Sequence, residues 1–283
     1  MVWNIVTDSS CDLEDFVLSE GDFVIRHTSV PFIIGVDSQE YVDDANMNVE
    51  AMLDHMERSR QASSTSCPTP ASWEEAFRAE GNVIAITISK ELSGSYNSAC
   101  VAKEMVLEDE PDKKIAIINS ISAGAGVVLI LRMLSDYIKS GNSFEKCVEH
   151  IEKVARLKRT IFALSSFDNL VKNGRMSKMA GFVAKKLNFW GIGVASKEGK
   201  IEMKDKVRGS KKAIKAIVED ILSFNTPIQR IVISNCQNKE MAEMLKAEIG
   251  ERFSEWKVEI EIHATKGLCS YYAERHGLIV AYI

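Results

Sequence analysis

The sequence predicts an α/β protein of two domains, an N-terminal three-layer α/β/α domain with a parallel sheet and a C-terminal α/β domain with a mixed sheet. The chain of 283 residues is long for one compact α/β layer. Strand patterns alternate with helix patterns through the first half, whereas the second half contains a hairpin pattern. We place the boundary near residue 158, so that the predicted domains are residues 1–158 and 159–283.

In the first half, short β-branched apolar runs alternate with stretches of helical spacing. Residues 61–70 are rich in Ser, Thr and Pro and are expected to form a loop. Ser72 and Glu75 match a capping box that opens the next helix. We expect strands at residues 2–7, 23–28, 30–34, 83–88 and 115–118, and helices at 48–58, 72–77, 96–107, 125–139 and 143–157.

In the second half, Glu198-Gly199 lies between two short apolar runs and predicts a hairpin of residues 193–196 with 200–203. The helical pattern at residues 168–188 is interrupted by Gly174. Further strands are expected at residues 160–164, 230–234, 258–264 and 278–282, and helices at 211–224 and 239–253.

Charge and apolar patterning exclude several classes of protein. The formal net charge is −5 and no basic tail or stripe occurs, which argues against nucleic-acid binding. The apolar run at residues 123–134 is about a dozen residues long and contains Arg132, so it is too short to span a bilayer. Six scattered cysteines without a CxxC motif fit reduced thiols. With Asp8 where a signal peptide needs apolar residues, we expect a cytoplasmic protein without stable membrane insertion.

Common cofactor and catalytic motifs are absent. Gly124-Ala125-Gly126 and Gly191-Ile192-Gly193 lack the third glycine of a dinucleotide-binding turn, and neither GxxxxGK[ST] nor GxSxG occurs. Cys147 and His150 lie one helical turn apart, but nothing nearby completes a metal site. The expected cofactor and metal content is therefore none.

Two hydroxyl-rich segments are candidates for binding an anion. Thr65 and Ser66 belong to a loop with two prolines before a helix, and Ser93-Gly94 lies between a strong strand and a helix. Ligands of parallel α/β sheets collect at the carboxyl ends of the strands, where helix N-termini offer free N–H groups. Ser93 and Gly94 can therefore form a small anion pocket, and helix capping by Ser93 is an equally good interpretation.

A third polar segment, Asp8-Ser9-Ser10, follows the first strand. It is compatible with a phosphotransfer aspartate at a strand end. Asp and Ser are also ordinary turn and cap residues, and that structural interpretation is preferred.

Four motifs in the same order make the sequence similar to the DegV family of bacterial fatty-acid-binding proteins along its whole length. Residues 5–13 (IVTDSSCDL) resemble the family's start, and residues 65–70 (TSCPTP) its TSQPSP loop. Residues 92–99 (LSGSYNSA) resemble its GLSGTYxSA segment, and residues 173–177 (NGRMS) its GGRIS turn.

The resemblance implies that this protein buries a long-chain fatty acid and has no turnover of its own. It implies that Thr65 or Ser66, together with Ser93 and Gly94, holds the carboxylate. It also implies a partner, the ATP-binding subunit of a fatty acid kinase that makes an acyl phosphate for phospholipid synthesis, with Arg175 acting in that step. A guanidinium suits this role because its planar set of N–H donors can form bidentate hydrogen bonds to phosphate oxygens. The alternative for Arg175 is a surface cation after a helix-breaking glycine.

The C-terminal region departs from the family pattern. Its GTHxGPG-like segment aligns with residues 264–270 (ATKGLCS), so Lys266 stands where the family has a histidine near the carboxylate. If Lys266 points inward, it adds a permanent cation to the carboxylate site. If it points outward, the hydroxyl groups act alone.

Two other functions are carried as alternatives. One is a phosphotransfer enzyme that uses Asp8 and Ser93 on a small hydroxylated metabolite. The other is a regulatory protein that senses lipid without handing it on. The absence of a nucleotide-binding loop favours the fatty-acid carrier.

Overall fold

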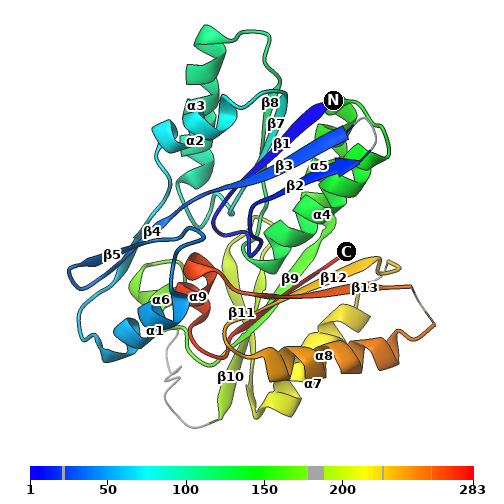
Figure 1. The fold of residues 1–283 in the computed structure, drawn as a ribbon. Helices are drawn as coiled ribbons and strands as arrows, with labels where there is room; N and C mark the ends of the chain where they lie inside the picture. The colour runs from blue at the N-terminus through cyan, green and yellow to red at the C-terminus, as the bar shows by residue number, and fades with distance from the viewer. Residues whose placement is uncertain (21–22, 178–187, 225, 256) are drawn as a thin grey trace.

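The computed structural model describes residues 1–20, 23–177, 188–224, 226–255 and 257–283. Its strands form a five-stranded sheet, a six-stranded sheet and a small three-stranded sheet. Figure 1 shows the two larger sheets one above the other, with α4 (Ala125–Lys139) between them. No helix in these ranges is long and apolar enough to cross a membrane.

The five-stranded sheet has the order β2-β3-β1-β7-β8 and comes from the first half of the chain. Its strands are β1 (Val2–Asp8), β2 (Phe16–Glu20), β3 (Phe23–Val30), β7 (Asn82–Thr87) and β8 (Ile115–Asn119). β3, β1, β7 and β8 are parallel, as predicted, whereas β2 joins as an antiparallel edge strand that the sequence patterns did not reveal. Mixed sheets of this kind are common among doubly wound folds.

Helices cover both faces of this sheet, because side chains alternate along each strand. Val83 and Ala85 of β7 pack under α2 (Pro70–Phe77) and α3 (Ser95–Asp109). Ile84 and Ile86 pack on the opposite face, under α4 and α5 (Phe144–Leu157). The three-layer α/β/α arrangement predicted for the N-terminal half is therefore confirmed.

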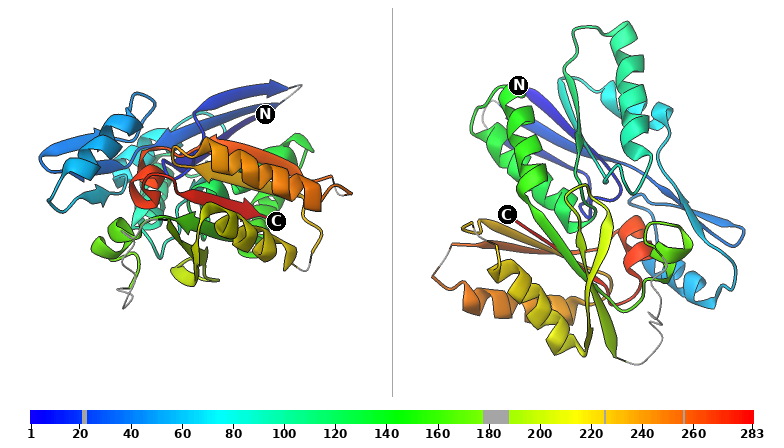
Figure 2. Two further views of the ribbon diagram at one scale, coloured as in Figure 1. Left: turned by 90° about the horizontal axis from the view of Figure 1, so that it is seen from below. Right: turned by 180° about the vertical axis from the view of Figure 1, so that it is seen from behind.

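The six-stranded sheet has the order β11-β10-β9-β14-β12-β13 and begins at Arg159. All neighbouring pairs are antiparallel except β12 with β13, so the sheet is mixed, as predicted. Its strands are β9 (Arg159–Leu164), β10 (Phe189–Ala195), β11 (Ile201–Arg208), β12 (Arg230–Asn235), β13 (Glu259–Ala264) and β14 (Leu278–Tyr282). Figure 2 shows α7 (Ser210–Leu222) and α8 (Lys239–Arg252) against the face that points away from the first sheet.

The small sheet belongs in sequence to the first half but packs against the second. It consists of β4 (Ile33–Val36), β5 (Gln39–Val42) and β6 (Ser64–Ser66), and α1 (Val49–Arg58) lies beside it. Its residue Ile34 shares an apolar cluster with Phe162 and Tyr271, next to α6 (Asp168–Lys172) and α9 (Gly267–Ala273). Residues 33–66 therefore join the two halves, a connection that the placement of a boundary near residue 158 did not anticipate.

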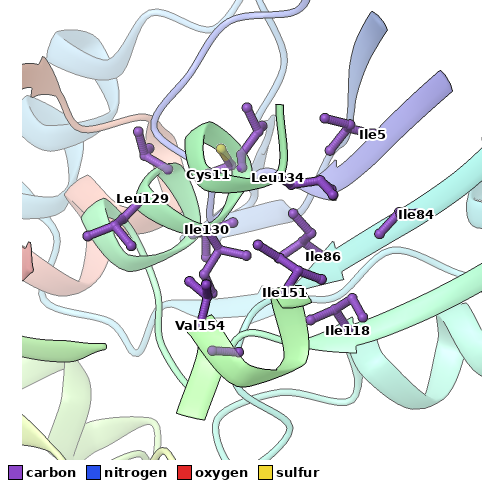
Figure 3. Packing of buried hydrophobic residues seen from close by; sticks show 14 of the residues in the cluster. Ile5, Cys11, Ile84, Ile86, Ile118, Leu129, Ile130, Leu134, Ile151 and Val154 are labelled. Atoms are coloured by element: carbon purple, nitrogen blue, oxygen red, sulfur yellow. The ribbon is translucent and has the colours of Figure 1, made fainter. Parts of the chain in front are cut away.

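The long apolar run of the sequence forms α4. Side chains of this helix and of α5 point into one apolar cluster with Ile5, Ile84 and Ile86 of the first sheet, as Figure 3 shows. The same cluster includes Val232 and Ala281 of the second sheet. A helix with apolar side chains around most of its circumference is expected at such a buried position.

Several elements begin or end elsewhere than predicted. The helix expected from Ser72 begins at Pro70 and is capped by Thr69 Oγ1, which accepts the Ser72 N–H, because proline suits the first helical position. The helix expected at residues 168–188 ends at Lys172, since Gly174 adopts a positive φ of 73°. Residues 178–187 of that prediction lie outside the described residues. β5, β6 and α9 were not predicted.

The position of α4 leads to a prediction about cooperativity. Leu129 is fully buried in the cluster of Figure 3, so Leu129→Ala should lower the free energy of unfolding by about 2–5 kcal/mol. Because α4 packs on both large sheets, denaturant unfolding should remain a single transition when it is followed by probes in either half. The exposed α3 residue Val101 provides the control, Val101→Ala, with an expected change within about 0.5 kcal/mol. Two separated transitions would show that the halves unfold independently.

Candidate ligand-binding cavity

An apolar cavity lies where the carboxyl ends of the first sheet's strands meet the inner face of the second sheet. The empty space between its walls, with the solvent at its open mouth included, is about 810 Å³. Its apolar walls are formed by Phe32, Ile88, Leu92, Ala123, Phe162, Leu164, Leu170, Ala195, Ile201, Leu268, Ala273 and Ile279.

Strand β9 supplies the floor of the cavity. Phe162 and Leu164 face the cavity, whereas the intervening residues Ile161 and Ala163 pack under α7 and α8. Gly193 lies opposite Phe162 in the β9–β10 pairing. A Cβ at Gly193 would overlap the ring of Phe162, so the glycine gives the ring room to lie against the sheet.

At one end of the cavity, hydroxyl groups from three segments converge. Thr65 Oγ1 is hydrogen-bonded to the Tyr272 hydroxyl at 2.8 Å, and Ser93 lies on the same wall. One bond between two hydroxyl groups uses only one of their two protons. Ser93 Oγ accepts the Ser95 N–H at 3.2 Å, so its own proton can be donated. This end of the cavity therefore offers two O–H donors to an acceptor.

Arg175 joins this polar end to the second half of the chain. Its Nε donates to the Leu92 carbonyl at 3.1 Å and its Nη1 to the Asn173 carbonyl at 2.6 Å. The guanidinium is thus fixed beside Ser93, and among the described residues none accepts from its Nη2. Arg175 is half-buried and bonded at two atoms, so the cation that follows Gly174 is anchored to the protein.

Ser122 and Thr160 form a second hydroxyl pair on the cavity wall. Ser122 Oγ and Thr160 Oγ1 are hydrogen-bonded at 2.8 Å, and both side chains are buried. Gly126 allows this approach, because a Cβ there would overlap Ser122. Thr160 lies near the start of β9, whereas Arg175 follows beyond the strand's carboxyl end. Ser122 and Thr160 therefore add a second polar group to the cavity wall.

Asp8 has a structural role behind the polar end. It is fully buried and accepts hydrogen bonds from the Ile88 N–H at 2.9 Å and the Ser95 hydroxyl at 2.6 Å. Ser10 donates to it from both its N–H and its hydroxyl. Burial raises the pKa of Asp8 above its usual value, and the four donors oppose that shift. Asp8 ties β1, β7 and the start of α3 together and is absent from the cavity wall.

Two further carboxylates hold α9, which supplies Leu268, Tyr272 and Ala273 to the wall. Asp43 accepts the N–H groups of Gly267 at 2.7 Å and Leu268 at 2.8 Å. Asp12 accepts the Lys266 N–H at 2.9 Å, so three free N–H groups of the helix N-terminus are satisfied by anions. A Cβ at Gly267 would overlap Asp43, which explains the glycine.

The structure brings Thr65, Ser93 and Arg175 to one cavity, but not Ser66, Gly94 or Lys266. Ser66 is exposed because side chains alternate along β6 and Thr65 takes the inward position. Gly94 caps α3 and faces the Cys67 side chain. Neither residue lies on the cavity wall.

Lys266 does not line this cavity, so of the two orientations considered for it the structure has the outward one. Its ammonium donates to Ser29 Oγ at 3.3 Å and lines a separate surface hollow with Asp12, Asp15 and Asp43. Its charge helps to hold the pKa values of Asp15 and Asp43 down against the larger effect of burial, which raises them. The acidic neighbours explain why the cation points away, so the hydroxyl groups and Arg175 remain at the cavity.

Sequence reasoning missed Tyr272 and the Ser122–Thr160 pair. Tyr272 lies on a helix of seven residues, too short to show a helical period. Ser122 lies in a turn between β8 and α4, and Thr160 was assigned only to a strand. For the pair Cys147 and His150, Cys147 Sγ donates to the Asn142 carbonyl and the His150 ring stacks on Tyr137 at 4.0 Å. The described residues contain no cluster of three or more His, Cys, Asp or Glu side chains that could hold a metal.

These features define an α/β ligand-binding protein whose cavity has mostly apolar walls and is also lined by hydroxyl groups and the Arg175 side chain. The family model described as "Uncharacterised protein, DegV family" matches residues 2–281. The chain therefore belongs to the DegV family.

Relatives match over their full lengths. A DegV domain-containing protein of Streptococcus pneumoniae R6 is 40% identical over 282 residues, covering 100% of this chain and 99% of the relative. The structure of the S. pneumoniae fatty acid kinase (Fak) B3 protein loaded with linoleic acid superimposes with a TM-score of 0.94 at 39% identity, covering 100% and 99% of the two chains. A DegV family protein of Eubacterium eligens loaded with heptadecanoic acid gives 0.89 at 32% identity, covering 99% and 98%.

The buried carboxylate of Asp12 predicts an unusual dependence of stability on pH. Burial raises its pKa from 3.8 to about 6, and its Oδ2 has no hydrogen-bond partner in the described part of the chain. The folded state therefore binds this proton more tightly than the unfolded state does. Through Asp12, the free energy of unfolding should rise by about 2 kcal/mol as the pH falls from about 6 to about 4.

The measurement is denaturant unfolding at pH 7 and pH 4.5. Wild type should gain stability relative to Asp12→Asn, which keeps an acceptor for the Lys266 N–H but does not titrate. Asp112→Asn, at an exposed position, should follow the wild-type profile. Parallel profiles for wild type and Asp12→Asn would show that the Asp12 pKa is not raised by folding.

Proposed function

We propose that this protein binds a long-chain fatty acid in the apolar cavity, with its carboxylate at Thr65, Ser93 and Arg175, and presents it in the cytoplasm to an ATP-dependent fatty acid kinase. The observation that carries the proposal is that the cavity has mostly apolar walls and that Thr65, Ser93 and Arg175, which retain unused donors, line it together. Relatives of the same fold at 39% and 32% identity carry linoleic acid and heptadecanoic acid.

The polar end suits a carboxylate. Ser93 and the Thr65–Tyr272 pair each have one O–H proton to donate, and the Arg175 guanidinium adds a positive charge. Hydrogen bonds to a charged acceptor contribute about 1.5–3 kcal/mol each, more than neutral ones. These groups fix the orientation of the acid and favour its ionised form.

The apolar wall supplies most of the affinity. Each buried methylene contributes roughly 0.8 kcal/mol, so a long chain outweighs the head-group contacts several times over. A small anion would gain only the contacts at the polar end. The many apolar side chains of the wall therefore favour a long-chain acid over a short one.

The kinase partner follows from the relative that is itself named a fatty acid kinase B protein. The carboxylate would lie beside Arg175, whose Nη2 has no acceptor among the described residues and can meet phosphate oxygens. Since Arg175 is anchored to Leu92 and Asn173, its position does not depend on the partner. In this role the chain supplies the acyl substrate, and the partner supplies ATP and its binding site.

The shape of the cavity can be tested at Gly193. Gly193→Ala should push the Phe162 ring into the cavity, because the new Cβ would overlap it. We expect organic extraction and mass spectrometry of the purified wild type to release long-chain acid, and the affinity of Gly193→Ala for an eighteen-carbon acid to fall at least about tenfold. A shorter acid should lose less.

The matched control is Gly250→Ala on α8, where a Cβ would have open space around it. This variant should bind as wild type and gain up to about 1 kcal/mol of stability. Wild-type protein that is free of lipid and fails to bind any long-chain acid would refute the proposal.

Arg175 separates a carrier from a lipid sensor. Arg175→Ala should retain fatty-acid binding within about tenfold, since the apolar wall is intact, but should lose acyl-phosphate formation in the presence of the kinase and ATP. Lys172→Ala, an exposed cation of the same turn, should behave as wild type. Undiminished acyl-phosphate formation by Arg175→Ala would remove this residue from the transfer step. Lack of any product with wild type would instead favour a sensor.

A further inference from the structure

A second hollow adjoins the apolar cavity, and its walls carry mostly basic side chains. Thr160 and Ala195 lie on the walls of both. The hollow lies where the carboxyl end of α5 meets the start of β9 and the β10–β11 turn. It is basic, and in the described part of the chain no Asp or Glu side chain lines it. Its ionisable side chains are His150, Lys153, Arg156, Lys158, Arg159 and Lys197.

Lys158 distinguishes this hollow from an ordinary basic surface. Its side chain is buried, with 6% exposed, whereas Lys153, Arg156, Arg159 and Lys197 are exposed. Among the described residues, none forms a hydrogen bond or ion pair with its ammonium. Burial alone lowers the pKa of Lys158 from 10.5 to about 7. A buried cation without a counter-ion is costly to the fold, and such groups concentrate at functional sites.

The other charged side chains that line the hollow around Lys158 are also positive. Arg156 lies 3.6 Å from Glu152, which leaves Lys153, Arg159 and Lys197 around Lys158. The pKa of His150 is lowered, mainly by burial and also by the ammonium of Lys153. Ile283 also lines the hollow, and its main-chain oxygen accepts the Gln229 N–H at 2.7 Å. In a protein of net charge −5, this concentration of positive charge attracts anions.

We propose that the hollow at Lys158, Arg159 and Lys197 is a binding site for the phosphoryl group of a small phosphate or phosphate ester. Several cations around the ammonium of Lys158 exceed what a single carboxylate would neutralise, and they suit a dianion with several acceptor oxygens. A large acidic surface is disfavoured, because only a small group can reach a side chain that is 94% covered. The site is independent of the fatty-acid proposal.

The test is titration of the whole protein with inorganic phosphate, and in a second arm with ethyl phosphate, at constant ionic strength set with sodium chloride. Amide resonances of Lys158 and Thr160 report binding. Lys158→Met should weaken phosphate binding at least about tenfold and also raise the melting temperature, since it replaces an unpaired buried charge by an apolar side chain of similar length. Lys146→Met, on the exposed face of α5, should change neither property.

This pair of outcomes distinguishes a ligand site from a structural lysine. A structural lysine would give a less stable Lys158→Met variant. Tighter binding of ethyl phosphate than of phosphate would assign the site to an ester, and the reverse order to the free ion. Unchanged phosphate affinity in Lys158→Met would overturn the proposal. Binding only to vesicles of anionic lipid, with no response to phosphate in wild type, would also overturn it.

Discussion

The cavity depends on how the N-terminus of α9 is held. Asp43 and Asp12 accept three consecutive backbone N–H groups, from Lys266, Gly267 and Leu268. Both carboxylates come from the first half of the chain, whereas α9 belongs to the second. The contact therefore joins the halves and also places Leu268 and Tyr272 on the cavity wall. Without it, α9 would have unsatisfied N–H groups at a buried end, which is a costly arrangement.

The buried polar groups around the cavity have two different roles. Buried polar groups that are fully engaged, such as Asp8, hold the backbone of the first sheet's carboxyl edge. Groups that retain an unused donor, such as Ser93 and Arg175, face the cavity. The apolar wall between them carries the binding energy, and the polar groups determine which end of a ligand goes where. The orientation of a ligand and the affinity for it thus come from different side chains.

Much of the fold could be predicted because the first sheet shows strong alternation of β-branched strands with helices. The sequence patterns missed β2, β5 and β6, because these are short strands at sheet edges whose residues are partly exposed. They also missed α9, because a helix of about two turns is too short to show a helical period. For the site, Ser93 and Thr65 follow from their places at a strand end and before a helix, but the resemblance to a family was needed to connect them with Arg175. The orientation of Lys266 could not be predicted, because it depends on Asp12, Asp15 and Asp43, which approach it only in the folded chain. Tyr272 was missed because its helix, α9, is too short to show a helical period.

The central claim is that an acyl chain lies along β9 with its carboxylate at Thr65 and Ser93. The most direct measurement is a crystal structure with a long-chain acid that carries bromine on its terminal carbon, located by anomalous scattering. We predict one bromine peak among the apolar side chains of the cavity, away from Ser93 and Arg175, with the carboxylate between Ser93 and Tyr272. A bromine peak beside Ser93 and Arg175, or no peak within the cavity, would contradict it.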